Sequence, residues 1–476
     1  MIRNEGKQKT MSQIKIIIPI LIGALIYLLP SPMGLDLKGW HMFAIFLATI
    51  IGIILKSMPM GAVALFGMLA ACLTGILDIN KEAITAFGSN TIWLVVLVFF
   101  IARGFIKTNL ASRIAYQFVS LLGKRSLGLG YGIILSELLM APFIPSNTAR
   151  AGGVIFPITK SISEALGSSP AAGTERDLGS YLIQVAYHGN LITSAMFLTA
   201  MAANPMAQAF AAKLGVQISW IEWARAALMP GLASIVIVPF LLYVVYPPKI
   251  KELPEAKIWA NKKLLDLGSM SSKEWIMTMT FAVMIIFWAI GDRFGIAPSL
   301  VALFGLCTLL FFDILTMEDI LKETESWHTL LWLSILVMMA GCLDKFGFIT
   351  WFSSQITYSI AGLSWPVALL TLVLVYFYSH YFFAGNAAHV GAMYTAFLSV
   401  AISIGSPPLM SALILGFFSS LFSSMTHYAT APASVLFGSG YVPIGEWWFY
   451  GLIVGTANVI VWLFIGAIWW KILGLW

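Results

Sequence analysis

Two short polar segments lie in strongly apolar surroundings and have the composition of anion-binding sites. They read Ser146-Asn147-Thr148-Ala149-Arg150 and Gly385-Asn386-Ala387-Ala388-His389. Each begins with small polar residues and an asparagine, and each ends with an arginine or a histidine. At the start of a helix, such residues combine side-chain donors with backbone N–H groups that have no partner inside the helix. An anion such as a carboxylate is the ligand that this combination favours.

The two segments are 239 residues apart (385 − 146), and the same spacing recurs elsewhere in the chain. It relates Trp93-Leu94 to Trp332-Leu333, Gly123 to Gly362 and His188 to His427. A spacing of 238 relates Val63-Ala64-Leu65-Phe66-Gly67 to Val301-Ala302-Leu303-Phe304-Gly305. One half of the chain is therefore predicted to be a diverged copy of the other. In a membrane protein, this pattern indicates a transporter whose substrate site lies between the repeats.

The composition is that of an integral membrane protein. Apolar residues make up 59% of the chain and charged residues only 10%, against roughly 25% charged in soluble domains. Apolar runs recur at about the length that spans a bilayer. The net charge of +6 is explained by Lys and Arg on one side of the membrane and predicts no nucleic-acid partner. Three scattered cysteines, Cys72, Cys307 and Cys342, predict buried apolar positions and no metal or cofactor.

The basic N-terminal segment and the lysine-rich stretch 247–273 are both expected on the cytoplasmic side. An even number of crossings must then separate them. Six spans are predicted before that stretch and five after it, near 14–30, 41–57, 60–77, 91–107, 181–213, 227–246, 275–291, 298–316, 329–345, 409–440 and 447–472. Residues 127–166 and 365–404 are left over, and each carries one polar segment. Each is predicted to be a re-entrant hairpin, because non-helical backbone at that depth must be covered by protein or line a cavity.

The predicted fold is therefore an all-α polytopic membrane protein with about eleven transmembrane helices and two re-entrant helical hairpins. The predicted parts are an N-terminal cytoplasmic segment with the first transmembrane helix (1–40), a first repeat (41–246), a cytoplasmic linker (247–273) and a second repeat (274–476). Five crossings in each repeat unit would place the copies in inverted orientation, so that the first hairpin opens inward and the second outward.

Two opposed hairpin tips would bring two helix N-termini together. The ligand that suits such a pair is an elongated molecule with an anionic group at each end, such as a dicarboxylate. The alternative is that these small polar residues only let transmembrane helices pack closely and form hydrogen bonds.

Arg150 and His389 occupy equivalent positions after the two tips. An arginine inside a membrane segment costs roughly 2.5–3.5 kcal/mol on insertion scales, so it normally has a partner or faces a cavity. The alternatives for Arg150 are a position at the membrane interface and an ion pair, for which Glu137 is the candidate. The alternative for His389 is a neutral, hydrogen-bonded imidazole.

His188 and His427 precede two segments that could be unwound breaks in long helices, Gly189-Asn190 and Thr430-Ala431-Pro432. No third or fourth zinc ligand is evident beside the two histidines. They are expected to make structural or gating hydrogen bonds.

Ser146-Asn147-Thr148 resembles the hairpin-tip motif of the divalent anion:sodium symporter family, also called INDY-type transporters. Gly385-Asn386-Ala387 retains only the asparagine of that motif, while Thr430 and Pro432 resemble the family's second-half substrate loop and Gly189-Asn190 the first-half one. The resemblance is closest to the 2-oxoglutarate/malate translocator branch, whose members are exchangers. It implies a homodimer in which a transport domain carries both hairpins and moves against a scaffold domain by an elevator motion. A bacterial inner membrane with a cytoplasmic N-terminus is the expected location.

In sodium-coupled members of the family, two cations beside the hairpin tips balance the charge of the substrate. The hypothesis for this chain is that Arg150 and a protonated His389 replace them. An emptied site would then keep its positive charge, and a penalty of roughly 2.5–3.5 kcal/mol would slow the empty return on the order of a hundredfold. This predicts obligate, sodium-independent exchange of dicarboxylates. A sodium- or proton-coupled di- or tricarboxylate symporter is the alternative, and no motif of an intramembrane enzyme is present.

Overall fold

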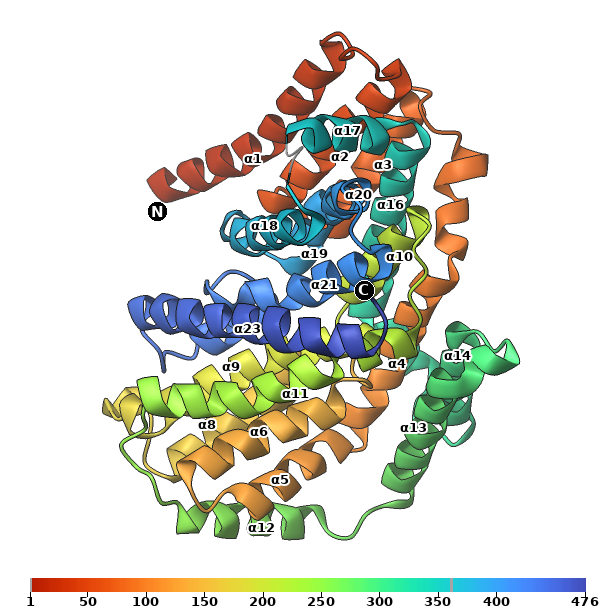
Figure 1. Cartoon of the computed structure of the whole chain (residues 1–476). Helices are drawn as coiled ribbons and strands as arrows, with labels where there is room; N and C mark the ends of the chain where they lie inside the picture. The colour runs from red at the N-terminus through yellow and green to blue at the C-terminus, as the bar shows by residue number, and fades with distance from the viewer. Residues whose placement is uncertain (1, 360–362) are drawn as a thin grey trace. The chain divides into compact units, whose positions relative to one another are not determined.

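The computed structural model describes residues 2–359 and 363–476, with side chains for 14–291, 293–356 and 363–476. Within these residues the regular structure is helical, and the one β-bridge joins Arg125 to Glu252 (Figure 1). The all-α membrane fold is confirmed. Seven described segments are long and apolar enough to cross a membrane: α2 (Leu37–Ile54), α4 (Asn90–Lys107), α11 (Trp220–Val245), α13 (Ser272–Ile290), α16 (Thr324–Lys345), the stretch Trp365–Phe382, and α23 (Ile444–Ile472).

Every predicted span contains a helix. The remaining spans correspond to α1 (Ile2–Leu28), α3 (Met60–Leu73), α14 (Pro298–Phe311), and two pairs of shorter helices, α9 (Gly179–Met196) with α10 (Ala203–Lys213) and α21 (Pro408–Leu421) with α22 (Ala431–Phe437). The long spans predicted for 181–213 and 409–440 are each interrupted, as the possible breaks in the sequence indicated. The sequence also missed several short helices, namely α5 (Leu110–Leu122), α12 (Pro254–Leu267), α15 (Met317–Lys322) and α17 (Phe348–Ser359).

The chain divides into two compact units. Unit 1 comprises Met1–Val96, Pro205–Ile218 and Thr324–Leu415, and unit 2 comprises Leu97–Asn204, Ser219–Glu323 and Gly416–Trp476. Each unit therefore takes segments from both halves of the sequence.

In unit 1, α2 packs against both α1 and α3, and α16 packs against α3. Small residues allow the close approach of these helices. A Cβ atom on Gly67 of α3 would lie 2.2 Å from Oγ1 of Thr49 on α2, and one on Gly23 of α1 would lie 2.7 Å from Cβ of Ala48. Glycine at such contacts is typical of packing between membrane helices.

In unit 2, α9 packs against both α6 (Ser126–Met140) and α11, and α11 also packs against α23; α11 and α23 lie side by side in Figure 1. The polar linker 247–273 contains α12, which lies against α5. Its start is tied to the beginning of α6, since Ser126 N donates to Lys251 O at 2.9 Å and Leu253 N donates to Lys124 O at 2.8 Å. The linker therefore helps to hold the first hairpin.

The internal repeat is visible in backbone detail. After each polar tip the chain forms four α-helical residues, then a five-residue π-helical segment, then α-helix again. In the first half these are α7 (Asn147–Arg150), η3 (Ala151–Ile155) and α8 (Phe156–Ala165), and in the second α19 (Asn386–His389), η9 (Val390–Tyr394) and α20 (Thr395–Ser403). The corresponding residues are 239 apart (386 − 147). π-Helical segments are rare and frequent at functional sites, so their recurrence at the same two positions supports a common origin of the hairpins.

Two ion pairs obey the same symmetry. Lys107 Nζ lies 2.5 Å from Asp319 Oδ2 in unit 2, and Lys345 pairs with Glu82 in unit 1. The two lysines are 238 residues apart (345 − 107), and each pairs with a residue from the opposite half of the sequence. The Lys107 ammonium lowers the pKa of Asp319 to about 2.

Candidate functional site: two hairpin tips and two helix breaks

The first hairpin belongs to unit 2 and turns over between α6 and α7. Ser146 is the N-cap of α7, and its Oγ accepts a hydrogen bond from Ala149 N at 3.1 Å. A serine at this position is a preferred N-cap, because its side chain satisfies one of the backbone donors that a helix start leaves over. The helical arm continues without a break through η3 and α8. Its remaining N-terminal donors are available at the tip, beside Asn147 and Thr148.

Arg150 joins four parts of unit 2. Its side chain is fully buried. Nε lies 2.7 Å from Glu137 Oε1 on α6, Nη2 donates to Ser194 Oγ at 2.6 Å, and Nη1 donates to two backbone carbonyls, those of Ile144 and Ala200. Ile144 is in the hairpin turn, while Ala200 lies in the break between α9 and α10. The guanidinium therefore holds the tip of the hairpin to the broken helix.

The ion pair with Glu137 is the alternative that the sequence left open for Arg150. The pair as a whole carries no net charge, so Arg150 is not the unpaired cation that the sequence predicted, and its part in balancing the substrate charge stays a prediction. Asn190 of α9 completes the contact, because its Nδ2 donates to Glu137 Oε1 at 2.6 Å and to Asn147 O at 3.2 Å. Breaking such a buried pair from one side costs about 3–5 kcal/mol.

The first helix break lies at residues 197–202 and not at Gly189-Asn190. Phe197 is extended, η6 (Leu198–Ala200) is a single 3-10 turn, and α10 begins at Ala203. Thr199 Oγ1 donates to Pro142 O in the hairpin turn at 2.8 Å. Asn204 Nδ2 donates to Ser194 O at 2.7 Å and to Phe197 O at 2.8 Å, which satisfies two carbonyls freed by the break.

Gly189 and Asn190 instead lie inside the continuous helix α9. Gly189 permits close packing, since a Cβ atom there would lie 2.4 Å from Ile134 Cγ1 on α6. His188 is buried on the same helix, and neither of its ring nitrogens has a hydrogen-bond partner among the described residues. The hydrogen bond predicted for His188 is therefore absent from this part of the structure.

The second helix break lies at residues 425–430, directly before α22, and overlaps the predicted segment Thr430-Ala431-Pro432 only at Thr430. Thr430 is the extended N-cap residue of α22, with φ −153° and ψ 163°, and Pro432 is in the first turn of that helix. His427 accepts a hydrogen bond from Trp448 Nε1 at 3.1 Å, which confirms a structural hydrogen bond for this histidine. α22 packs against α7 and η3 of the first hairpin. The second break therefore meets the first hairpin within unit 2.

A sequence signal for the first break exists and was missed. Residues 199–205 read Thr-Ala-Met-Ala-Ala-Asn-Pro and residues 426–432 read Thr-His-Tyr-Ala-Thr-Ala-Pro. Both fit Thr-x-x-Ala-x-x-Pro, at a spacing of 227 (426 − 199). The spacing of 239 that pairs His188 with His427 is therefore misleading at this place, because twelve residues fewer separate the two breaks.

The second hairpin belongs to unit 1. It consists of α18 (Trp365–Tyr378), η8 (Ser379–Phe382), an extended Phe383, and the arm that begins at α19. Gly385 is the N-cap residue and has no side chain to cap the helix, while Asn386 and Ala387 follow in the first turn. The absence of a capping hydroxyl agrees with the departure from the family motif seen in the sequence.

His389 is fully buried and pairs with His380, a residue that the sequence did not single out. Their Nδ1 atoms are 2.9 Å apart. Ser379 Oγ lies 3.3 Å from His389 Nε2, and the ring of Phe383 stacks on that of His389 at 4.3 Å between centroids. In the sequence, His380 is distinguished only by its place just before the polar tip. That place alone does not predict a partner for His389.

The predicted residues thus form two groups. Unit 2 brings together the first hairpin and both helix breaks, with Ser146, Asn147, Thr148, Arg150, Asn190, Thr430 and Pro432. Unit 1 holds the second group, with Gly385, Asn386, Ala387 and His389. No cluster of three or more potential metal ligands occurs among the side chains that the structure describes.

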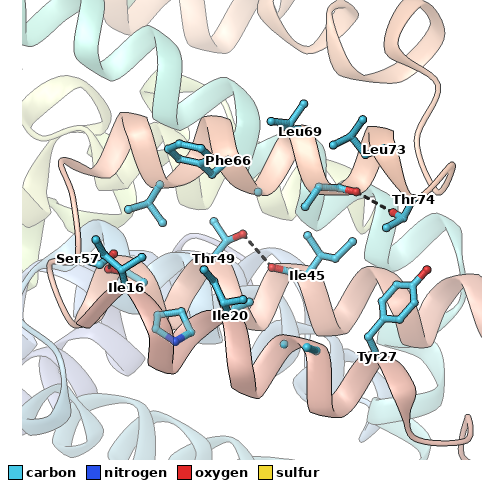
Figure 2. A pocket seen from close by; sticks show the side chains of 18 of the residues that line it. Ile16, Ile20, Tyr27, Ile45, Thr49, Ser57, Phe66, Leu69, Leu73 and Thr74 are labelled. Carbon is cyan, nitrogen blue, oxygen red and sulfur yellow. Dashed lines mark hydrogen bonds between the residues drawn. The ribbon is translucent and has the colours of Figure 1, made fainter. Parts of the chain in front are cut away.

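A large cavity in unit 1 contains none of these residues. It has a volume of about 810 Å³ and lies between α1, α2 and α3. Figure 2 shows its apolar walls, with Ile20, Phe66 and Leu69 among the side chains that line it. A space without charged or donor-rich lining does not suit an anion.

Comparison with known proteins assigns the family. Residues 10–476 match the family described as the sodium:sulfate symporter transmembrane region. The chain is 49% identical to the putative malate transporter YflS of Bacillus subtilis, over 100% of this chain and 99% of that protein. It is 48% identical to the chloroplastic dicarboxylate transporter 1 of Spinacia oleracea, over 96% of this chain and 81% of that protein. It is 33% identical to the citrate/succinate antiporter of Escherichia coli, over 97% of this chain and 98% of that protein.

Solved structures agree with the fold. The match to MtrF of Neisseria gonorrhoeae covers 97% of this chain and 94% of the MtrF chain, at a TM-score of 0.57 and 11% sequence identity. The YdaH transporter of Alcanivorax borkumensis covers 80% of this chain with 87% of its own, at a TM-score of 0.56 and 12% identity. Together with the hairpin-tip motif and the repeated arms, these matches identify the chain as an integral membrane transporter that belongs to the divalent anion:sodium symporter family.

Proposed function

We propose that this transporter binds dicarboxylates at its two hairpin tips and exchanges one for another across the membrane without sodium. Two features support dicarboxylates as the substrate class. Each hairpin arm starts at its tip with a donor-rich helix N-terminus, which suits one carboxylate. The relatives include a chloroplastic dicarboxylate transporter and a citrate/succinate antiporter.

The observation that carries sodium independence is the position of the Arg150 guanidinium. In transporters with broken helices, sodium is typically coordinated by carbonyl oxygens of unwound backbone. Here two such carbonyls, of Ile144 in the hairpin turn and Ala200 in the helix break, accept hydrogen bonds from Arg150 Nη1. A permanent cation therefore uses the oxygen atoms that would attract a mobile one.

Charge compensation has to be divided between two kinds of group. The Arg150–Glu137 pair is neutral, so it contributes hydrogen-bond donors and rigidity at the first tip. Additional positive charge for a dianion would come from the helix N-termini and from a protonated His389. One uncompensated charge left near the bilayer centre would slow the return of an empty carrier on the order of a hundredfold, which favours exchange over net transport.

An elevator movement of both hairpins, a homodimer, and a bacterial inner membrane with a cytoplasmic N-terminus belong to the same proposal. They rest on the family to which the chain belongs. The alternative is a sodium- or proton-coupled symporter with the same fold.

Counterflow in proteoliposomes separates the two functions. Vesicles with the full-length protein would be prepared with and without internal succinate, and uptake of labelled succinate would be measured in sodium and in choline media. We expect uptake only into succinate-loaded vesicles, at equal rates in both media. Uptake into empty vesicles that requires a sodium gradient would overturn the proposal.

An asparagine variant connects transport to the tip. Asn147→Ala should reduce exchange strongly, because the side chain stands at the start of the helical arm that faces the substrate. Asn80→Ala changes an exposed asparagine in unit 1 and serves as the control. Equal exchange by both variants would show that the first tip does not bind the substrate.

A further inference from the structure

The second hairpin contains a pair of buried imidazoles whose geometry limits their protonation. His380 is 1% exposed and His389 is fully buried. Their rings lie nearly parallel, 12° apart, and their Nδ1 atoms are separated by 2.9 Å, a hydrogen-bond distance. A hydrogen bond between two ring nitrogens needs one protonated and one unprotonated nitrogen. The contact therefore requires that one Nδ1 carries a hydrogen and the other does not.

The two rings therefore differ in tautomer. The ring that donates from Nδ1 has an unprotonated Nε2, and the ring that accepts at Nδ1 carries its hydrogen at Nε2. Ser379 Oγ lies 3.3 Å from His389 Nε2, where it accepts or donates according to the tautomer of that ring.

The pair can take one more proton but not two. The first added proton goes to Nε2 of the ring that donates the shared hydrogen bond, and this bond persists because Nδ1 of the other ring still accepts. A second added proton would have to go to that accepting Nδ1 and would place two N–H groups against each other. The pair therefore carries a charge of zero or one.

The neighbouring helices supply no other charge at the pair. α18, η8, α19, η9 and α20 contain no Asp, Glu, Lys or Arg, and Tyr376 is the ionisable group whose ring contacts His389, at 4.6 Å between centroids. The charged and titratable residues of α2 and α16, which also pack against this hairpin, lie in the first five residues of each helix or in the last four of α16: Lys38, His41, Glu325, His328, Cys342, Asp344 and Lys345. α17, which packs against α20, contains no Asp, Glu, Lys, Arg, His or Cys.

The corresponding positions of the first hairpin hold permanent charges. Tyr376 and His389 stand 239 residues after Glu137 and Arg150 (376 − 137), and in each hairpin the two side chains are in contact. The fixed ion pair of Glu137 and Arg150 in the first hairpin is thus matched in the second hairpin by two ionisable side chains, Tyr376 and His389.

We propose that His380 and His389 together form a binding site for a single proton, and that occupation of this site provides the positive charge that offsets one carboxylate of the substrate. The inference rests on the proposed function, because it assumes that a dicarboxylate binds at the second tip. A dianion that binds the protonated pair more tightly shifts the pair toward its protonated form. By linkage, the protein must therefore take up protons when the dianion binds. While the pair keeps its proton after the substrate leaves, that charge opposes the return of the empty carrier, so exchange should be strictest at low pH.

The test measures proton uptake and binding in one titration. Fumarate would be added to the purified full-length protein in weakly buffered detergent solution at a series of pH values around neutrality, with a pH dye to count protons and calorimetry to measure affinity. We expect uptake that approaches, and does not exceed, one proton per bound fumarate. In the range where uptake is largest, affinity should fall up to tenfold for each unit of rising pH.

Variants distinguish the pair from a general effect of pH. His389→Gln should take up a proton on His380 alone and at a different pH, since the nitrogen across the shared hydrogen bond is gone, and the double variant H380Q/H389Q should take up none. His380→Gln should retain uptake by His389 alone but at a different pH, because its partner nitrogen is gone. The control is His41→Gln, a histidine of α2 whose ring stacks on Tyr27 at 3.7 Å, and it should behave like the unchanged protein.

The failures are separable. Fumarate binding without proton uptake at every pH, more than one proton per site, or full uptake by H380Q/H389Q would overturn the proton site while leaving dicarboxylate binding intact. Absence of binding by the unchanged, folded protein would instead overturn the proposed function. Thermal unfolding of each variant shows whether it is folded, and His380→Gln provides the test should H389Q not fold.

Discussion

Replacement of Arg150 by methionine should loosen the first hairpin tip and the first helix break together. Methionine roughly preserves the bulk of the side chain but removes bonds to Glu137, Ser194 and two backbone carbonyls. Loss of one partner of a buried pair costs about 3–5 kcal/mol. At about 1.4 kcal/mol per tenfold, local opening should become roughly a hundredfold to a few thousandfold more frequent.

Hydrogen–deuterium exchange measures that opening directly. Peptides that cover residues 141–150 and 197–204 should exchange faster in Arg150→Met by this factor, since the guanidinium connects the two segments. Arg225→Met, which alters an exposed arginine on α11, is the matched control and should leave both peptides unchanged.

A double variant separates the charge from the hydrogen bonds. Arg150→Met leaves the Glu137 carboxylate buried without its cation, so the additional change Glu137→Gln should recover part of the lost protection. Less than a tenfold change in either peptide of Arg150→Met would refute the idea that this side chain holds the tip to the break.

Three further outcomes are expected. Lys107 lowers the pKa of Asp319, so the ion pair stabilises the fold above the ordinary carboxyl pKa of about 4 and loses this effect as the pH falls toward 2. At neutral pH, Asp319→Asn should therefore unfold at a lower temperature than the unchanged protein. In acid, the two unfolding temperatures should converge. Gly189→Ala should lower the unfolding temperature because its Cβ would meet Ile134 at 2.4 Å, and the added change Ile134→Ala should restore part of the loss. Ser146→Ala removes an N-cap worth about 1 kcal/mol, so calorimetry should show dicarboxylate affinity reduced roughly fivefold, and unchanged affinity would contradict a role for the capped tip.

The fold was largely predictable because its main signals are periodic and repeated. Apolar runs of membrane-spanning length predicted segments that each contain a helix, and two similar polar segments at one spacing marked the two turns that lead into α7 and α19. The helix breaks were harder to place. Gly189 looked like a break, yet glycine in a membrane helix often serves close packing, which is its role against α6.

The site could be predicted in residue type but not in partnership. Three of the acceptors that surround Arg150 are a serine hydroxyl and two backbone carbonyls, and carbonyls leave no trace in a sequence. Its neutralisation by Glu137 was foreseen only as an alternative, because a distance of thirteen residues (150 − 137) does not reveal how two hairpin arms face each other. His380 was missed for a related reason, since its meaning comes from the ring opposite.

The interleaving of the two halves has a consequence for biogenesis. Unit 1 needs residues up to Leu415 and unit 2 needs residues up to Trp476, so no autonomous half-molecule emerges when the ribosome has finished the first repeat. Helices inserted early must wait in the lipid for partners that arrive late, with Lys107 and Glu82 lacking their counter-ions until then. A premature stop codon in the second repeat before Leu415 would accordingly leave both units unfinished.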